Sequence, residues 1–244
     1  MTKSITFLFI AILLFSCSND GPRIDYSENL LIHYPFSGNS DDQSGNGFDG
    51  SSNATLTKDR FDKVNSAYSF NGQNEYIDLP NFPSLKPQFP VSFSFWVKFD
   101  DLLPENTVIF TTDFEQDNHS GVWMNLSGGK VAINYGDASG NTTSSNRRTK
   151  VGTTTITPDK WYHVIGIIEG PTNMEIFIDC NNDQGSYSGS GGDLDYTLNP
   201  GSIGRKDGNT NFSAYYFSGT LDNFRYWNRT LTLDEISTLC IENN

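Results

Sequence analysis

Oxygen-bearing side chains are concentrated in a glycine-rich segment near the start of the chain. Asp41, Asp42 and Asn46 lie together between Gly38 and Gly50. Ca²⁺ takes about six to eight oxygen ligands from carboxylates, carbonyls and water, which a tight acidic loop can supply. The segment therefore predicts a calcium ion with a structural rather than a catalytic role. The alternative, which the sequence leaves open, is that the carboxylates only cap turns by accepting backbone N–H groups.

Several aromatic side chains have polar neighbours, a combination that suits sugar binding. Trp96 shares the polar side of an alternating segment with Ser92, Ser94 and Lys98, which predicts an open sheet face. The alternative is that Trp96 packs beneath a covering loop. The other candidate ligand-binding residues are Trp123, Tyr215, Tyr216 and Arg147. Arg147 lies in a long polar segment, residues 137–150, and such segments often carry recognition.

Catalytic arrangements are weakly supported. A retaining glycosidase needs two carboxyl groups about 5–5.5 Å apart. Glu175 and Asp179 have a spacing that would place them on one face of a strand, but Phe177 lies between them. A polysaccharide lyase would need a basic cleft with histidine, and His163 is better explained by packing. We therefore expect no enzyme, with a carbohydrate-active hydrolase or lyase as the minor alternative.

Composition narrows the class of protein further. The 244 residues include 16 Lys and Arg against 29 Asp and Glu, a net charge of −13. This balance excludes a typical nucleic-acid partner, which needs a basic stripe. Aromatic residues make up 14% of the chain and charged residues 18%, which suits a packed core rather than disorder.

The N-terminus has the pattern of an export signal. Lys3 precedes an apolar run at residues 5–15, which is too short to span a bilayer as a stable helix. The run ends in Leu14-Phe15-Ser16-Cys17, which resembles a bacterial lipobox. We expect residues 1–16 to be a lipoprotein signal peptide, Cys17 to be lipidated and residues 17–29 to form a leader. Ser18 resembles outer-membrane sorting, and the membrane face stays open. The alternative is an ordinary secretory peptide with a free Cys17 thiol.

Two further cysteines, Cys180 and Cys240, remain in the body of the chain. Outside the inner membrane they could form a disulfide, which would stabilise the fold by closing a long loop. The alternative is two separate thiols, because the sequence gives no distance between them.

Strand patterns dominate the body of the chain. Val91–Phe99 alternates apolar and polar residues, and residues 161–168 form a more continuously apolar run. Further strands are expected at residues 30–36, 66–70, 75–79, 107–111, 122–126, 130–135, 173–179 and 214–226. One short helix is expected at residues 232–240, where Thr232 and Glu235 have the spacing of a capping box. These elements predict an all-β sandwich of two antiparallel sheets over residues 30–244.

Several segments, taken in order, resemble the laminin-G-like domains of the concanavalin A-like lectin/glucanase superfamily. They are LIHYPFSGNSDDQSGNGFDG at 31–50, AYSFNGQNEYIDL at 67–79, VSFSFWVK at 91–98, WYHV at 161–164, EIFID at 175–179 and FSGTLDNFRYWNRTLTLDEI at 217–236. The resemblance implies a jelly roll. It also implies that Asp222 approaches the acidic loop and joins Asp41, Asp42 and Asn46 at the calcium ion. Leu221 alternates out of phase with Phe224, which predicts a β-bulge near Asp222.

The combined expectation is a lipid-anchored protein of the bacterial outer membrane that binds a polysaccharide or glycoconjugate without catalysis. A laminin-G-like fold serves lectins, enzymes and adhesion modules alike, so the fold does not decide among them. The main alternative is an adhesion or scaffold module that binds envelope proteins.

Overall fold

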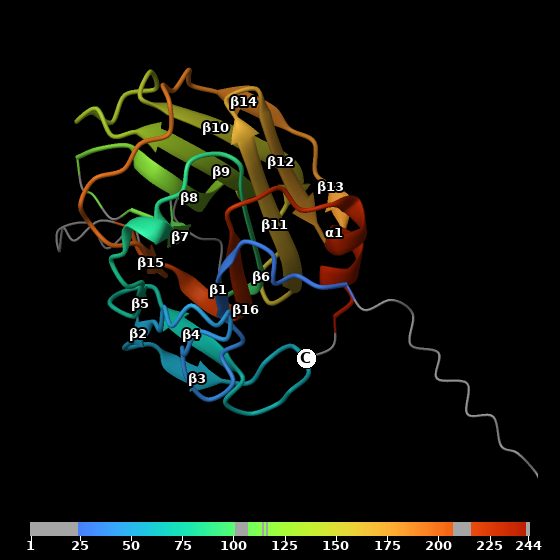
Figure 1. Ribbon diagram of the computed structural model, residues 1–244. Helices are drawn as coiled ribbons and strands as arrows, with labels where there is room; N and C mark the ends of the chain where they lie inside the picture. Colours follow the sequence, from blue (N-terminus) through green and yellow to red (C-terminus); the bar gives the residue numbers. More distant parts are fainter. Residues whose placement is uncertain (1–23, 101–106, 114, 116, 207–215, 243–244) are drawn as a thin grey trace, which may run out of the picture.

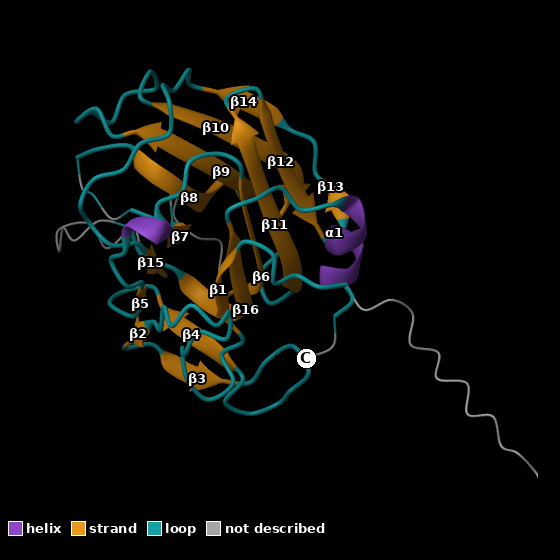
Figure 2. Cartoon of the chain, viewed as in Figure 1, coloured by secondary structure: helices purple, strands orange, loops and turns teal. Residues whose placement is uncertain are grey.

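The computed structural model describes residues 24–100, 107–113, 115, 117–206 and 216–242. Two antiparallel sheets pack face to face, and one short helix lies outside them (Figure 1; Figure 2). In spatial order the first sheet contains β13 (Asn181–Asn182), β12 (Asn173–Ile178), β11 (Trp161–Gly170), β6 (Val91–Phe99), β16 (Ser218–Trp227), β4 (Ala67–Asn71) and β3 (Thr55–Thr57), with β1 (Leu30–Tyr34) paired to β16. The second contains β14 (Ser186–Ser188), β10 (Arg147–Thr155), β9 (Lys130–Asp137), β8 (Ser120–Ser127), β7 (Val108–Thr111), β15 (Ser202–Ile203), β5 (Ile77–Asp78) and β2 (Ser51–Ser52). The expected two-sheet sandwich is confirmed.

The alternation in β6 decides which face of the first sheet meets the core. Phe93, Phe95 and Phe99 are almost completely buried between the sheets. The Phe93 ring meets Phe110 of β7 with centroids 5.4 Å apart, and the Phe99 ring meets Phe217, which precedes β16, at 5.6 Å. Burial of each such ring stabilises the fold by about 1.5–3 kcal/mol. Many of the aromatic side chains of the sequence therefore lie in the core.

The expected β-bulge is present in β16. The register between β16 and β6 shifts between Asp222 and Arg225, and Asn223 has a φ of 54°. The extra residue turns Asp222 and Arg225 toward the outer face of the first sheet, while Phe224 stays in the core.

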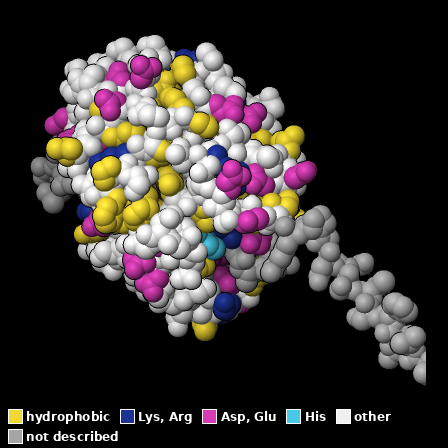
Figure 3. Space-filling model, viewed as in Figure 1, with side chains coloured by type: hydrophobic (Ala, Val, Ile, Leu, Met, Phe, Trp, Pro, Cys, Tyr) yellow, Lys and Arg dark blue, Asp and Glu magenta, His cyan; other side chains and the backbone are white. Residues whose placement is uncertain are grey.

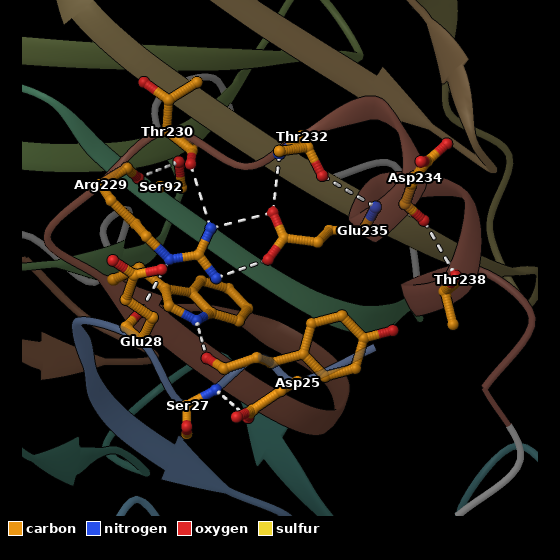
Figure 4. Close-up of polar contacts among 12 residues, drawn as sticks. Asp25, Ser27, Glu28, Ser92, Arg229, Thr230, Thr232, Asp234, Glu235 and Thr238 are labelled. Atoms are coloured by element: carbon orange, nitrogen blue, oxygen red, sulfur yellow. Dashed lines mark hydrogen bonds and ion pairs between the residues drawn. The ribbon is translucent and has the colours of Figure 1, made fainter. Parts of the chain in front are cut away.

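Helix α1 (Leu233–Leu239) covers part of that outer face. Thr232 and Glu235 form the expected capping box, in which each side chain accepts the other's backbone N–H. Below the helix, Ile236 and Leu239 pack with Ile165 and Trp227 in a second apolar cluster. Figure 4 shows how Arg229 joins this helix, donating to both carboxylate oxygens of Glu235. In the part of the chain that is described, no helix has the length and apolarity needed to cross a membrane.

Candidate functional site

The outer face of the second sheet brings predicted ligand-binding residues together. Trp123 of β8 pairs with Asn134 of β9, and Asn134 pairs with Thr149 of β10. Arg147 lies two residues from Thr149, so its side chain is on the same face. Trp123 and Arg147, which are 24 residues apart in the sequence (147 − 123), therefore belong to one surface.

Hydrogen bonds join these residues into a polar ladder across three strands. Arg147 Nη1 donates to Thr149 Oγ1 at 2.5 Å, and Thr149 Oγ1 donates to Asn134 Oδ1 at 2.6 Å. Asn134 Nδ2 then donates to Asn125 Oδ1 at 2.8 Å. The ladder (Arg147, Thr149, Asn134 and Asn125) is buried except at Arg147, which is half-buried. Arg147 is thus the end of the ladder where a ligand has access, and its remaining N–H groups are held in a fixed direction.

The indole of Trp123 lies at the opposite part of this face. The His119 ring stacks on it with centroids 5.4 Å apart, and Lys206 Nζ lies 3.8 Å from the ring centroid. Burial, helped by the charge of Lys206, lowers the pKa of His119 to about 4, so the imidazole is neutral at pH 7. With 5% exposure, the Trp123 ring is enclosed by its neighbours, and it supports the face rather than offering a free stacking platform.

Trp96 lies on the other sheet and outside this face. Arg60 lies over its ring at 4.6 Å, and the His163 ring is 5.0 Å away. The structure matches the alternative in which Trp96 packs beneath a loop, because Arg60, from residues 58–65, lies over its ring.

Beside Trp96, two arginines hold acidic groups on the outer face of the first sheet. Arg60 forms a nearly buried ion pair with Asp222. Arg225 donates to both carboxylate oxygens of Glu242, at 2.7 and 3.0 Å. Burial raises the pKa of Asp222 to about 6, while Arg60 opposes that rise.

The acidic loop uses its oxygens for its own backbone. Asp42 Oδ1 accepts the N–H groups of His33 and Ser44, both at 2.9 Å. Asp42 Oδ2 accepts the Ser44 hydroxyl and the Phe48 N–H, at 2.7 and 3.0 Å. The side-chain amide of Asn46 donates to the carbonyl of Leu30 at 2.8 Å, and exposed Asp41 accepts from Asn39.

These contacts bear on the predicted calcium ion. The bulge residue Asn223 approaches the loop through His33 Nε2 at 2.9 Å, whereas Asp222 faces Arg60. Among the described residues, no group of three or more His, Cys, Asp or Glu side chains is placed to hold a metal ion. Asp42 and Asn46 thus stabilise the loop through hydrogen bonds to its backbone, Asp222 forms an ion pair, and the calcium ion stays a prediction.

The remaining predicted residues have separate positions. Cys180 and Cys240 form a disulfide with their Cα atoms 5.6 Å apart, which ties the end of β12 to the end of α1. Tyr216 is half-buried in the bend before β16. Tyr215 and Cys17 lie outside the described residues.

In the middle of the ladder, Thr149 is not marked by hydrophobic alternation in the sequence. Residues 137–150 were expected to be a loop, but β10 begins at Arg147 and runs to Thr155. Its residues are almost all polar, so hydrophobic alternation gave no signal there. Asn134 could have been found, because it alternates with Ile133 and Tyr135 in a predicted strand and must face away from the core.

Comparison with known proteins agrees with this architecture. A family profile of laminin-G type, described as "Concanavalin A-like lectin/glucanases superfamily", matches residues 71–237. The chain belongs to this family. Like the family's other sandwiches, this laminin-G-like domain is a jelly roll. No curated protein sequence matches it.

Solved structures with the same fold come from proteins that bind other molecules. Domain 4 of AbnA, a GH43 extracellular arabinanase from Geobacillus stearothermophilus solved with arabinotriose, has a TM-score of 0.60 and 21% identity, covering 87% of this chain and 98% of that one. The binding domain of Paraclostridial Mosquitocidal Protein 1 has a TM-score of 0.64 and 17% identity, covering 88% of this chain and 52% of that one. The binding domain of Botulinum neurotoxin DC, in complex with rat synaptotagmin II, has a TM-score of 0.64 and 11% identity, and it also covers 88% of this chain and 52% of that one. The laminin-G-like domain thus spans about half the length of both toxin chains.

Proposed function

We propose that this laminin-G-like domain binds carbohydrate without catalysis and belongs to a lipid-anchored protein of the bacterial outer membrane. The observation that carries the proposal is the polar ladder of the second sheet, which ends at half-buried Arg147. Sugar hydroxyls are recognised by side-chain amides and guanidinium groups whose positions are already fixed. The ladder supplies one such group, the Arg147 guanidinium, and fixes its position on a rigid sheet.

The charge of the protein favours a neutral glycan. The net charge is −13, and acidic side chains are spread over the visible face rather than gathered in one patch (Figure 3). A uronate-rich chain would be repelled by this field. The arabinotriose bound by the arabinanase domain is a neutral oligosaccharide, which supports the same class of ligand.

A non-catalytic role is supported by the contacts of Glu175 and Asp179, the two acidic residues with the spacing of a possible glycosidase pair. Asp179 accepts the backbone N–H of His163 at 2.9 Å and lies 3.5 Å from Lys160 Nζ. Glu175 accepts from the Asn182 side chain at 3.3 Å. Both carboxylates are on the first sheet or at its edge, away from the ladder, and both have structural partners.

Glycan binding by the wild-type protein and an Arg147→Ala variant tests the proposal. Neutral oligosaccharides, starting with arabinotriose, would be titrated against both proteins. We expect at least about a tenfold loss of affinity in the variant, because a hydrogen-bond donor that faces the ligand is removed. Lys58→Ala is the matched control, because Lys58 is a cation with 59% side-chain exposure outside the ladder.

Two results would contradict the proposal. Equal affinity of the wild-type and Arg147→Ala proteins would remove the ladder as the binding site. Failure to bind any neutral glycan, together with specific capture of one envelope protein, would favour a protein-binding adhesion or scaffold module instead.

A further inference from the structure

Exposed apolar side chains gather near the C-terminal end of the described chain. Four large hydrophobic residues there are mostly in contact with solvent: Phe61 (51% exposed), Val64 (65%), Leu233 (71%) and Ile241 (73%). We call these four residues the C-terminal rim. A single exposed apolar residue is common on protein surfaces, but several at one end of a domain indicate an interaction surface.

Hydrogen bonds bring the two halves of the rim together. Arg60 Nη2 donates to the carbonyl of Glu242 at 2.8 Å, and its guanidinium lies 4.5 Å from the Phe61 ring. Phe61 follows Arg60 directly, and Ile241 precedes Glu242 directly. The loop between β3 and β4 is therefore fixed beside the end of the chain, as Figure 1 shows.

Helix α1 adds an exposed side chain, Leu233, eight residues before Ile241. Leu233, Ser237 and Ile241 follow each other at intervals of four residues, all are exposed, and Ile236 and Leu239 face inward. Burial of the inner residues leaves the outer aliphatic side chains without a partner in the described part of the chain.

The N-terminal segment is attached at this same end. Trp227 Nε1 donates to the carbonyl of Tyr26 at 2.8 Å, and Arg229 Nε donates to the carbonyl of Glu28 at 2.7 Å. Figure 4 shows this segment held against Arg229, which also binds the capping residue Glu235. The chain therefore leaves the domain beside α1 from a fixed point near Ile24.

The distance from that point to a lipidated Cys17 is limited. Ile24 is seven residue steps after Cys17 (24 − 17), and an extended chain spans at most about 3.6 Å per residue, or about 25 Å in total. This reach is shorter than the diameter of a domain of this size, so residue 24 cannot lie on the side of the domain that points away from the bilayer.

We propose that the C-terminal rim docks on the lipid headgroup surface of the membrane that holds the anchor. Phe61, Val64, Leu233 and Ile241 enter the headgroup region, and exposed Lys63 of the same loop meets lipid phosphates, whereas Lys58 is paired with Asp62. The lipid anchor at Cys17 and the contact of the C-terminal rim together orient the domain, and the second sheet stays available for a ligand. The inference rests on the lipid anchor of the proposed function and is independent of the glycan.

An environment-sensitive fluorophore on a single added cysteine tests the docking. The full-length acylated protein would be reconstituted in vesicles of phosphatidylethanolamine and phosphatidylglycerol and labelled at Val64→Cys. Leu198→Cys is the matched control, because Leu198 is 92% exposed and lies in a loop held by Lys86 and Asn81. Asn81 and Lys86 flank the turn Pro83–Leu85, which Figure 2 shows on the side away from α1.

Docking predicts a blue shift and quenching by bromine-labelled lipid at position 64, with neither at position 198. Phe61→Asp with Ile241→Asp should abolish the shift while the protein still floats with the vesicles. Floating protein with equal, water-like emission at both positions would overturn the docking and keep the anchor. Protein that carries no acyl chain and does not float would overturn both. A shift that needs an added envelope protein would assign the rim to a protein partner and overturn the lipid proposal.

Discussion

Arg60 and Asp222 form an ion pair with side-chain exposures of only 6% and 5%, although 162 residues separate them in the sequence. The pair connects the β3–β4 loop to the bulge of β16, and Arg60 extends the connection to the carbonyl of Glu242. A residue expected to bind a metal ion thus has an internal cation as its partner.

Removing the cation of this pair should be strongly destabilising. Arg60→Leu leaves a buried carboxylate without a partner, and the free energy of unfolding should fall by about 3–5 kcal/mol in chemical denaturation at pH 8. The pKa of Asp222 is already raised by burial and should rise further without Arg60, so the native state of the variant binds a proton more readily. The loss should therefore be smaller at pH 5 than at pH 8. Arg60→Leu combined with Asp222→Leu should recover part of the stability, and a double variant no better than the single one would contradict this view of the pair.

Acid should destabilise the domain through His163. Burial, with help from Arg225 and Arg60, lowers the pKa of His163 to about 3, well below its ordinary value of 6.5. Between pH 6.5 and 3 the unfolded state therefore binds a proton at His163 and the native state does not, so the free energy of unfolding falls as the pH drops through this range. The slope from this group approaches about 1.4 kcal/mol per pH unit. His163→Gln should flatten the pH dependence of unfolding over that range, whereas an unchanged slope would assign the effect to other groups.

The disulfide should contribute to stability by restricting the unfolded chain. Cys180 and Cys240 are 60 residues apart, and closing a loop of that size is worth about 4 kcal/mol in the chain-entropy account. Replacing both cysteines by serine should lower the thermal midpoint, and a reducing agent should lower it only in the wild-type protein. Equal sensitivity of both proteins to reduction would show that the bond is not the cause.

Calcium dependence gives a direct test of the acidic loop. The four bonds that Asp42 accepts from the protein predict that a chelator leaves the thermal midpoint unchanged. A ligand that binds only the native state raises the midpoint. A rise with Ca²⁺ that Asp41→Ala abolishes would instead restore the calcium site predicted from composition.

Elements with a regular hydrophobic period could be predicted from the sequence. The alternation of Val91–Phe99, the continuous run after Trp161 and the capping box at Thr232 each encode local geometry, and the structure has β6, β11 and α1 there. The bulge at Asp222 could be predicted because a break in alternation is also a local signal.

Long-range polar partners could not be predicted in this way. Nothing near Arg60 in the sequence indicates that it meets Asp222, because the contact depends on where two distant loops are placed. Strand β10 was missed for a different reason: Arg147–Thr155 is almost all polar and owes its extended form to pairing with β9 and β14. Tertiary context decides the structure of such segments.

The pairing of β1 with β16 sets the order in which the molecule can be completed during synthesis. Leu30–Tyr34 finds its partner only when Phe224–Trp227 has been made, nearly two hundred residues later. The central strand β6 likewise waits for β16 on one side. The first sheet therefore cannot close around β16 until residues 218–227 have been made, and contacts of such high sequence separation form slowly.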